Sequence, residues 1–185
     1  MSELTPEATE TTGPRPSPLR HPLVTDVLVV LAWFVAAALL GALVWWQVTP
    51  LAEYTRTATD AAMGEDQLGR QVSADGWFFA IALIGGLVSG VALLALRRRD
   101  PVVTVVLVTL GGVLAAWLML RVGLWLGPAN PKDVLDSVAV GGKVPLQLET
   151  HTTGVFLGWP IGALLGATVV LWGSDDRHPR DVDRG

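Results

Sequence analysis

The chain of 185 residues is 51% hydrophobic and 16% charged, with a formal net charge of −4 and a mean hydropathy of +0.48. This composition is more apolar than that of an ordinary soluble domain of this size. The chain has no cysteine, which excludes disulfides and cysteine metal sites, and no basic patch indicates a nucleic-acid partner.

Long apolar stretches dominate the sequence after a proline-rich tail at residues 1–22, which is predicted to be disordered and cytoplasmic. They are Val27–Trp46, Gly76–Leu96, Val102–Leu126 and Gly154–Trp172. A helix of about 20 residues rises about 30 Å, enough to cross the hydrocarbon core of a bilayer. The sequence therefore predicts an all-α membrane protein. Its membrane domain, residues 23–172, is expected to be a four-transmembrane-helix bundle of two tandem helical hairpins, with a second cytoplasmic tail at 173–185.

Arginine placement predicts the orientation of this bundle. Most arginines lie on one side of the spans, in the two tails and in the short turn Arg97–Pro101. The other side carries only Arg56, Arg70, Lys132 and Lys143. By the positive-inside rule, we expect both termini in the cytoplasm and the loops 47–75 and 127–153 outside. The excess of arginine over lysine, with Ala, Val, Gly and Leu filling the spans, is typical of a GC-rich bacterial genome, so the expected location is the plasma (inner) membrane of a bacterium.

The outer ends of the spans carry two further signals. Several tryptophans fall near these ends, where an indole keeps its N–H in contact with water. They are Trp45, Trp46, Trp77, Trp125 and Trp159. Asp75 before Gly76, and Thr152 or Thr153 before Gly154, are expected to cap the starts of the second and fourth spans.

The first external loop contains candidate strands. Tyr54–Thr57 is rich in strand formers, Met63–Asp66 is typical of a turn, and Gln67–Val72 is a candidate returning strand. The alternative interpretation is an irregular loop with one short helix near residues 58–63.

The second external loop has the pattern of a two-residue hairpin. Val138–Val140 is followed by Gly141-Gly142 and then by Lys143–Glu149. Since an isolated hairpin is marginal in water, we expect the two loops to pair into a small external β-hairpin cap on the bundle, or to be covered by a partner.

Glycine recurs every four residues in the fourth span, at Gly154, Gly158, Gly162 and Gly166. Such a series lets a second helix approach closely. The second span offers a matching surface that includes Gly86 and Gly90. The two interpretations are packing inside the bundle and an interface to another subunit.

Arg121 is the one charged residue deep inside a predicted span, and Trp117 and Trp125 lie one helical turn before and after it. The structural interpretation is an interfacial anchor whose guanidinium lies over the indole rings. The functional interpretation is a side chain that faces inward and pairs with Asp75 or Glu149, with a lipid phosphate or with a carboxylate of a partner.

The candidate polar residues on the external side are Asp75, Glu149 and His151. His151 follows Glu149 by two residues and is a candidate pH sensor. The histidines have no metal-ligand spacing and the loop acids match no calcium loop. No motif for catalysis is present either, so no catalytic residue, metal site or cofactor is predicted and an enzyme is disfavoured.

Trp45-Trp46-Gln47 is followed by Pro50, Ala74–Phe78 opens the second span, and Arg121 precedes Gly127-Pro128. Together with the arginine cluster, these motifs resemble a family of uncharacterised actinobacterial four-span integral membrane proteins, over about residues 24–172. The resemblance implies an inner-membrane protein of this topology and carries no activity.

These features are compatible with several functions in the bilayer. The first is an accessory subunit that contacts a protein partner in the envelope, or further copies of itself, through its glycines and its external cap. The second is an oligomeric transport or lipid-handling component that uses Arg121. The predicted spans hold no Asp, Glu, Lys or His, which disfavours a proton or cation relay. The third, an enzyme on lipid-linked substrates, would need Arg121, His151 and Glu149.

Overall fold

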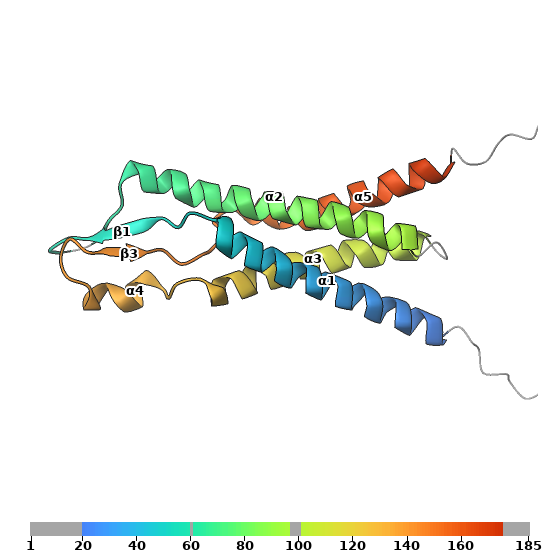
Figure 1. Cartoon of the computed structure of the whole chain (residues 1–185), viewed down its shortest axis with the longest axis horizontal. Coiled ribbons are helices and arrows are strands. Elements are labelled where there is room, and N and C mark those ends of the chain that lie inside the picture. Colours follow the sequence, from blue (N-terminus) through green and yellow to red (C-terminus); the bar gives the residue numbers. More distant parts are fainter. Residues whose placement is uncertain (1–19, 60, 97–100, 176–185) are drawn as a thin grey trace, which may run out of the picture.

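The computed structural model describes residues 20–59, 61–96 and 101–175. Long helices lie side by side in an elongated bundle, and a head of strands, short helices and loops stands at one end (Figure 1). The long helices are α1 (Arg20–Val48), α2 (Glu65–Leu96), α3 (Pro101–Leu126) and α5 (Gly158–Asp175). The predicted bundle of four long apolar helices is confirmed, and all four are long and apolar enough to cross a membrane.

The ends of these helices refine the predicted boundaries. α1 and α5 include residues 20–22 and 173–175, which the sequence assigned to the tails. The rest of both tails, 1–19 and 176–185, lies outside the described residues, as does most of the predicted turn at 97–100. The start of α1, the end of α2, the start of α3 and the end of α5 lie together at the end of the bundle away from the head (Figure 1).

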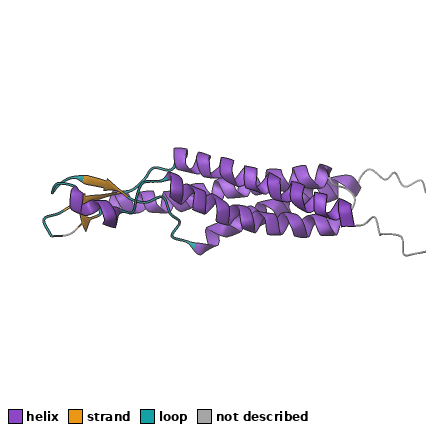
Figure 2. Cartoon of the chain, turned by 90° about the horizontal axis from the view of Figure 1, so that it is seen from below, coloured by secondary structure: helices purple, strands orange, loops and turns teal. Residues whose placement is uncertain are grey.

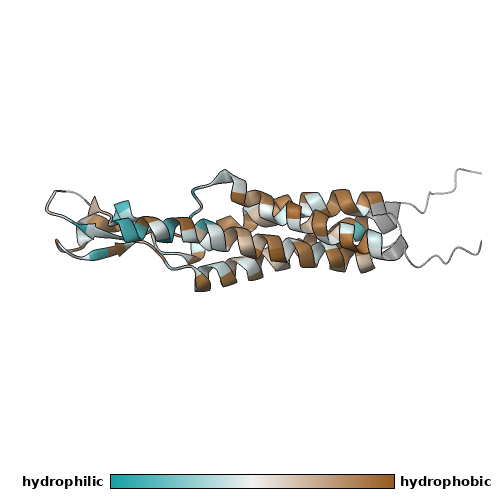
Figure 3. Cartoon of the chain, turned by 90° about the horizontal axis from the view of Figure 1, so that it is seen from above, coloured by the Kyte–Doolittle hydropathy of each residue, from teal (hydrophilic) through white to brown (hydrophobic). Residues whose placement is uncertain are grey.

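The bundle consists mostly of hydrophobic residues, and many of the hydrophilic residues lie in the head (Figure 3). Large apolar side chains point outward from every long helix, for example Leu40, Ile84, Leu110 and Val169. A helix that is apolar on all sides is typical of a membrane span or of the interior of a large protein.

α2 and α5 make the most extensive helix contact in the bundle, and glycine permits it. A Cβ atom built on Gly86 would lie 2.2 Å from the carbonyl oxygen of Trp159, and one on Gly90 would lie 2.1 Å from that of Ala163. No side chain fits at such distances. The two backbones therefore touch directly, an approach that places Cα–H groups against carbonyl oxygens.

The glycines of α5 reciprocate this contact. A Cβ on Gly162 would lie 2.2 Å from the carbonyl oxygen of Leu83, and one on Gly166 would lie 2.3 Å from that of Leu87. The predicted glycine series therefore packs inside the bundle. Gly154 does not take part, because it precedes α5 and a Cβ there would meet only a methyl group at 3.9 Å.

Trp159 fills the centre of the bundle. Its indole is buried, packs edge-on against Phe34 of α1 at a centroid distance of 6.3 Å, and lies against Gly41 of α1 and Gly85 of α2. The Nε1 atom has no hydrogen-bond partner among the described residues, so packing alone holds the ring. The prediction that Trp159 lies at the outer interface is wrong, because glycines on two other helices leave room for it inside.

Trp45 is likewise buried, against the prediction, whereas Trp46, Trp77 and Trp125 are exposed. The Trp45 ring lies over Gly123 of α3 and packs edge-on against Phe78 at 5.0 Å. Its Nε1 donates a hydrogen bond to the carbonyl oxygen of Ala74 at 3.0 Å. The Trp45 indole therefore fills the interior of the bundle at the end next to the head.

The head contains one small sheet, at the end of the molecule away from the helix termini described above (Figure 2). Its strands are β1 (Glu53–Arg56), β2 (Ala61–Ala62) and β3 (Lys143–Pro145). The strand order is β2-β1-β3, and β1 pairs antiparallel with both neighbours. The predicted sheet that joins the two loops is therefore confirmed.

The pairing inside the second loop differs from the prediction. β3 pairs with β1, not with Val138–Val140, because helical turns precede that segment: α4 (Pro131–Val134) and the 3-10 helix η1 (Leu135–Ser137). Asn130 caps α4 by accepting the backbone N–H of Lys132 at 3.1 Å, and Pro131 takes the first helical position. Gly141, with φ of 84°, reverses the chain, and its N–H donates to the carbonyl oxygen of Arg56 at 2.8 Å.

The first loop differs more. α2 begins at Glu65, so the predicted turn at Met63–Asp66, the returning strand at Gln67–Val72 and the Asp75 cap are wrong, as is the alternative helix near 58–63. The two acids Glu65 and Asp66 occupy the first turn, where they face the positive end of the helix dipole. No proline interrupts the chain from there to Leu96, and α2 runs without a break from the head into the bundle.

The entry into α5 is also later than predicted. A 3-10 helix, η2 (Thr153–Leu157), precedes α5, and the Thr152 side chain makes no capping hydrogen bond. Pro160 lies in the first turn of α5, where a missing N–H costs no helical hydrogen bond.

We expect Gly86→Ala and Gly162→Ala each to destabilise the bundle by about 1–3 kcal/mol, because a methyl group would collide with backbone carbonyls. Thermal unfolding in detergent, followed by circular dichroism, measures this. Gly76→Ala is the matched control: Gly76 also lies in α2, has no atom within 4 Å of its Cβ position, and should be neutral or slightly stabilising. Equal melting temperatures for all three variants would contradict the close contact.

Candidate functional site in the head

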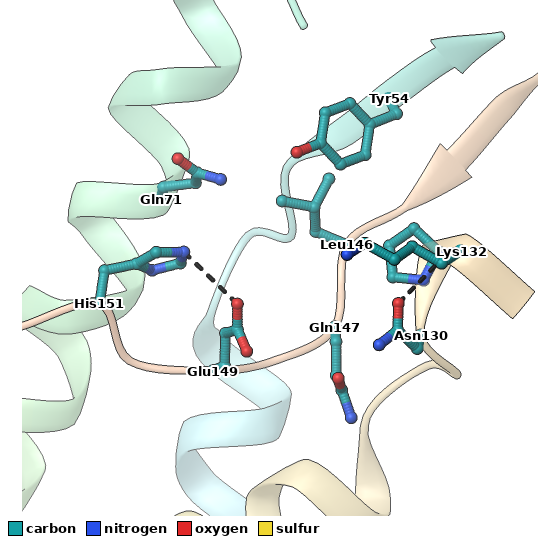
Figure 4. A pocket seen from close by; sticks show the side chains of 9 residues that line it. Tyr54, Gln71, Asn130, Lys132, Leu146, Gln147, Glu149 and His151 are labelled. Atoms are coloured by element: carbon teal, nitrogen blue, oxygen red, sulfur yellow. Dashed lines mark hydrogen bonds and ion pairs between the residues drawn. The ribbon is translucent and has the colours of Figure 1, made fainter. Parts of the chain in front are cut away.

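The head holds a pocket of about 340 Å³ between α2, β1, α4 and the chain that follows β3. Its lining is mostly polar (Figure 4). The lining residues are Tyr54, Gln71, Asn130, Pro131, Lys132, Leu146, Gln147, Glu149 and His151. Four segments that are distant in sequence thus contribute to one site.

The segment 146–151 forms one wall and is anchored at both ends. Leu146 donates its backbone N–H to the carbonyl oxygen of Ala52 at 2.8 Å. Leu148 is buried against Gly127 at the end of α3. At the other end, the backbone N–H of His151 donates to Oδ1 of Asp75 at 2.9 Å.

Asp75 is therefore a mid-helix residue whose carboxylate holds a distant backbone. Its side chain is buried at the head end of the bundle, and a hydrogen bond to an ionised acceptor is among the stronger ones. The sequence singled out Asp75 as a cap and as a candidate polar residue, and the structure places it next to His151, although the two are 76 residues apart.

Glu149 and His151 form the charged corner of the pocket. Nε2 of His151 lies 3.6 Å from Oε1 of Glu149, and both side chains are about half exposed. This contact is an ion pair when the imidazole is protonated. A role of His151 as a pH sensor stays a prediction.

Polar contacts also fix β1 to α2 beside the pocket. Oε1 of Gln67 accepts the backbone N–H of Glu53 at 2.9 Å. The Glu53 carboxylate in turn lies 3.1 Å from Nζ of Lys143 on β3. The N-terminal turns of α2 extend beyond the bundle into the head (Figure 1), and we call them the projecting part of α2. The strand β1, which carries Tyr54, is held between this part of α2 and β3.

Arg121 lies apart from this pocket, on the outer surface of α3. Its guanidinium stands 5.4 Å from the ring centroid of Trp117, as the sequence predicted for one of the two indoles. Trp125 is exposed further along. Within the described residues no ion pair joins Arg121 to Asp75 or Glu149, so the geometry matches an outward anchor.

The third function considered above, an enzyme using Arg121, His151 and Glu149, has only two of its residues together. Among the residues that the structure describes, no three His, Asp or Glu side chains gather closely enough to hold a metal ion. The pocket can form hydrogen bonds and contact a charged group, and its described side chains form no nucleophile–base pair.

Sequence reasoning named Glu149 and His151 but not the neutral polar residues around them. Tyr54, Gln71 and Gln147 come from a strand, a helix and a loop, and no spacing links them. The one local signal was the Asn130-Pro131 pair, which is typical of a helix start.

No known protein family, curated protein or solved structure matches this chain. The resemblance to actinobacterial four-span membrane proteins stays a prediction.

Replacing Asp75 tests the anchor of this wall. Asp75→Ala removes the acceptor of the His151 N–H and should cost about 1–3 kcal/mol of unfolding free energy, with faster amide hydrogen exchange at residues 148–152. Asp75→Asn keeps a side-chain oxygen acceptor and should lose less. If Asp75→Ala exchanges at the wild-type rate, the hydrogen bond does not hold the segment.

Proposed function

We propose that this chain crosses the plasma membrane of a bacterium with its four long helices, that the head lies outside, and that both termini are cytoplasmic. The large exposed apolar side chains on all four long helices support the crossing. Exposed Trp46, Trp77 and Trp125 lie toward the head end of their helices, where an aromatic belt is expected. The arginines at 97–99 belong to the connection at the opposite end.

The absence of cysteine makes the orientation simple to test. Thr55 is exposed on β1 of the head, and Thr11 belongs to the N-terminal tail. We expect a membrane-impermeant maleimide to label Thr55→Cys in intact cells and to label Thr11→Cys only after the membrane is permeabilised. Labelling of Thr11→Cys in intact cells would reverse the proposed orientation.

Within that topology, we propose that the protein is an accessory subunit that binds a protein partner of the envelope through its head. A filled bundle supports this proposal over transport through a single chain. Trp159, Phe34 and Met119 occupy the interior. Asp75, at the head end, is the only buried ionisable side chain of the described residues, so a charged path through the bundle is absent there.

The projecting part of α2 supplies a surface for the partner. Leu68 and Val72 lie one helical turn apart on this part and are 54% and 73% exposed. Leu68 and Val72 lie on the head side of the exposed Trp77, so in the proposed topology this face of α2 is in water. Apolar side chains that share one exposed helix face are typical of a groove-binding or helix-binding surface.

The proposal is tested by native mass spectrometry of the tagged protein, extracted from its own membrane in a mild detergent. We expect a stoichiometric second protein with the wild type and its loss with Leu68→Glu/Val72→Glu. Val140→Glu is the matched control, because Val140 is an exposed head residue of the second loop; it should keep the partner. Equal melting temperatures of the variants establish that folding is unchanged.

The alternative is an oligomeric transport or lipid-handling component. The inward orientation expected for a transport path is not observed, and what this alternative retains is the exposed guanidinium of Arg121 beside Trp117 as a possible contact for a lipid phosphate. In the same experiment this function gives a different result, a symmetric oligomer or a monomer that carries a phospholipid lost in Arg121→Leu. That result, without a second protein, would overturn the accessory-subunit proposal.

A further inference from the structure

The head pocket is lined by polar side chains, of which Tyr54, Gln71 and Gln147 are partly buried. The Tyr54 hydroxyl and the amides of Gln71 and Gln147 have no hydrogen-bond partner within the described part of the chain. Figure 4 shows the Tyr54 hydroxyl and the Gln71 amide pointing toward the same space. Each of these groups both donates and accepts hydrogen bonds, so Tyr54 and Gln71 present donors and acceptors to one occupant, whereas the Gln147 amide points away from them in Figure 4.

The charges in the pocket nearly balance. Lys132 contributes one positive charge and Glu149 one negative charge, and the carboxylate is already in contact with His151 at 3.6 Å. Phosphate sites, by contrast, gather several cations or a row of backbone N–H groups. The remaining polar lining is neutral, which favours an uncharged ligand rich in groups that both donate and accept.

The volume of the pocket and its apolar lining residues restrict the chemical class of the ligand further. A volume of about 340 Å³ lies at the small end of the range of ligand sites, about 300–1,000 Å³. Leu146 supplies apolar surface beside Tyr54 (Figure 4), and Pro131 adds a second apolar residue to the lining. A compact ring with polar hydroxyls and apolar C–H faces fits such a surface.

We propose that this pocket binds a glycosyl group, that is, one or two neutral sugar rings. The hydroxyls of a sugar both donate and accept, and they match the amide of Gln71 and the hydroxyl of Tyr54. The lining of this site includes neither Leu68 nor Val72, and the proposal goes beyond the partner binding proposed above.

The distance of the pocket from the proposed membrane surface allows the glycosyl group to come from two sources. Gln71 precedes the exposed Trp77 by six residues, a rise of about 9 Å along α2. A headgroup layer is about 5–8 Å thick on each side of the hydrocarbon core. In the proposed topology the pocket therefore opens at the outer edge of the headgroups, where both glycolipid headgroups and free saccharides arrive.

Tyr54 is the only tyrosine of the chain, so 3-fluorotyrosine labelling gives a single ¹⁹F resonance inside the pocket. The full-length protein in phosphatidylcholine nanodiscs would be titrated with glucose, galactose, mannose, N-acetylglucosamine and maltose. Glucosyl- and galactosyl-diacylglycerol would be incorporated in parallel nanodiscs. We expect a saturable shift of the resonance with at least one of these sugars in free or lipid-linked form.

Variants separate sugar binding from other causes of a shift. Gln71→Ala should weaken the binding about tenfold, which corresponds to the loss of one good hydrogen bond. Ser73→Ala, on the same helix but not in the lining, should bind as the wild type does. Inorganic phosphate should not shift the resonance, because a neutral sugar site gathers too few cations to hold an anion.

The outcomes distinguish a free sugar from a lipid-linked sugar, and they test whether the pocket binds a sugar at all. A shift with free sugars supports a soluble ligand, and a shift with the glycolipids alone supports a membrane-linked one. No shift with any sugar overturns the proposal, as does a phosphate-induced shift that Lys132→Gln abolishes, because the site would then bind anions. Labelled Gln71→Ala that melts like the wild type establishes that a loss of binding is not a loss of folding.

Discussion

The direct backbone contact between α2 and α5 is the constraint on which the rest of the structure depends. Gly86 and Gly90 of one helix and Gly162 and Gly166 of the other let the two backbones touch along the contact. Because α5 lies this close to α2, the chain that leads into α5 passes beside the turns of α2 that lie next to the head. Asp75 can then accept the His151 N–H, and the wall of the head pocket takes its place.

The same contact explains why the bundle is closed. Two helices that touch at their backbones leave little room between them, and Trp159 at the start of α5 fills the space toward α1. The indole Nε1 has no hydrogen-bond partner among the described residues, a cost of desolvation that tight packing must offset. The bundle is thus built as a solid support, and the polar chemistry of the described chain is concentrated in the head.

Much of this architecture is readable from the sequence, because it rests on local rules. An apolar run of about 20 residues is sufficient to predict a helix of membrane-spanning length, and the glycines at intervals of four predict close packing. The errors at Asp75 and Trp159 share one origin, namely partners that are distant in sequence. Asp75 was read as a cap because its acceptor role toward His151 is invisible locally, and the glycines that make room for Trp159 lie on other helices. The pocket was missed for the same reason, since Tyr54 and Gln71 meet only after β1, α2 and α4 assemble.

The unbroken course of α2 has a mechanical consequence. The helix comprises 32 residues, so it is about 48 Å long, well over the thickness of a hydrocarbon core of about 30 Å. A bundle in a bilayer that is too thin for it tilts to keep its apolar surface covered. Because no hinge separates the projecting turns of α2 from the part locked against α5, the head tilts through the same angle. The direction in which the head faces would therefore follow the thickness of the surrounding membrane.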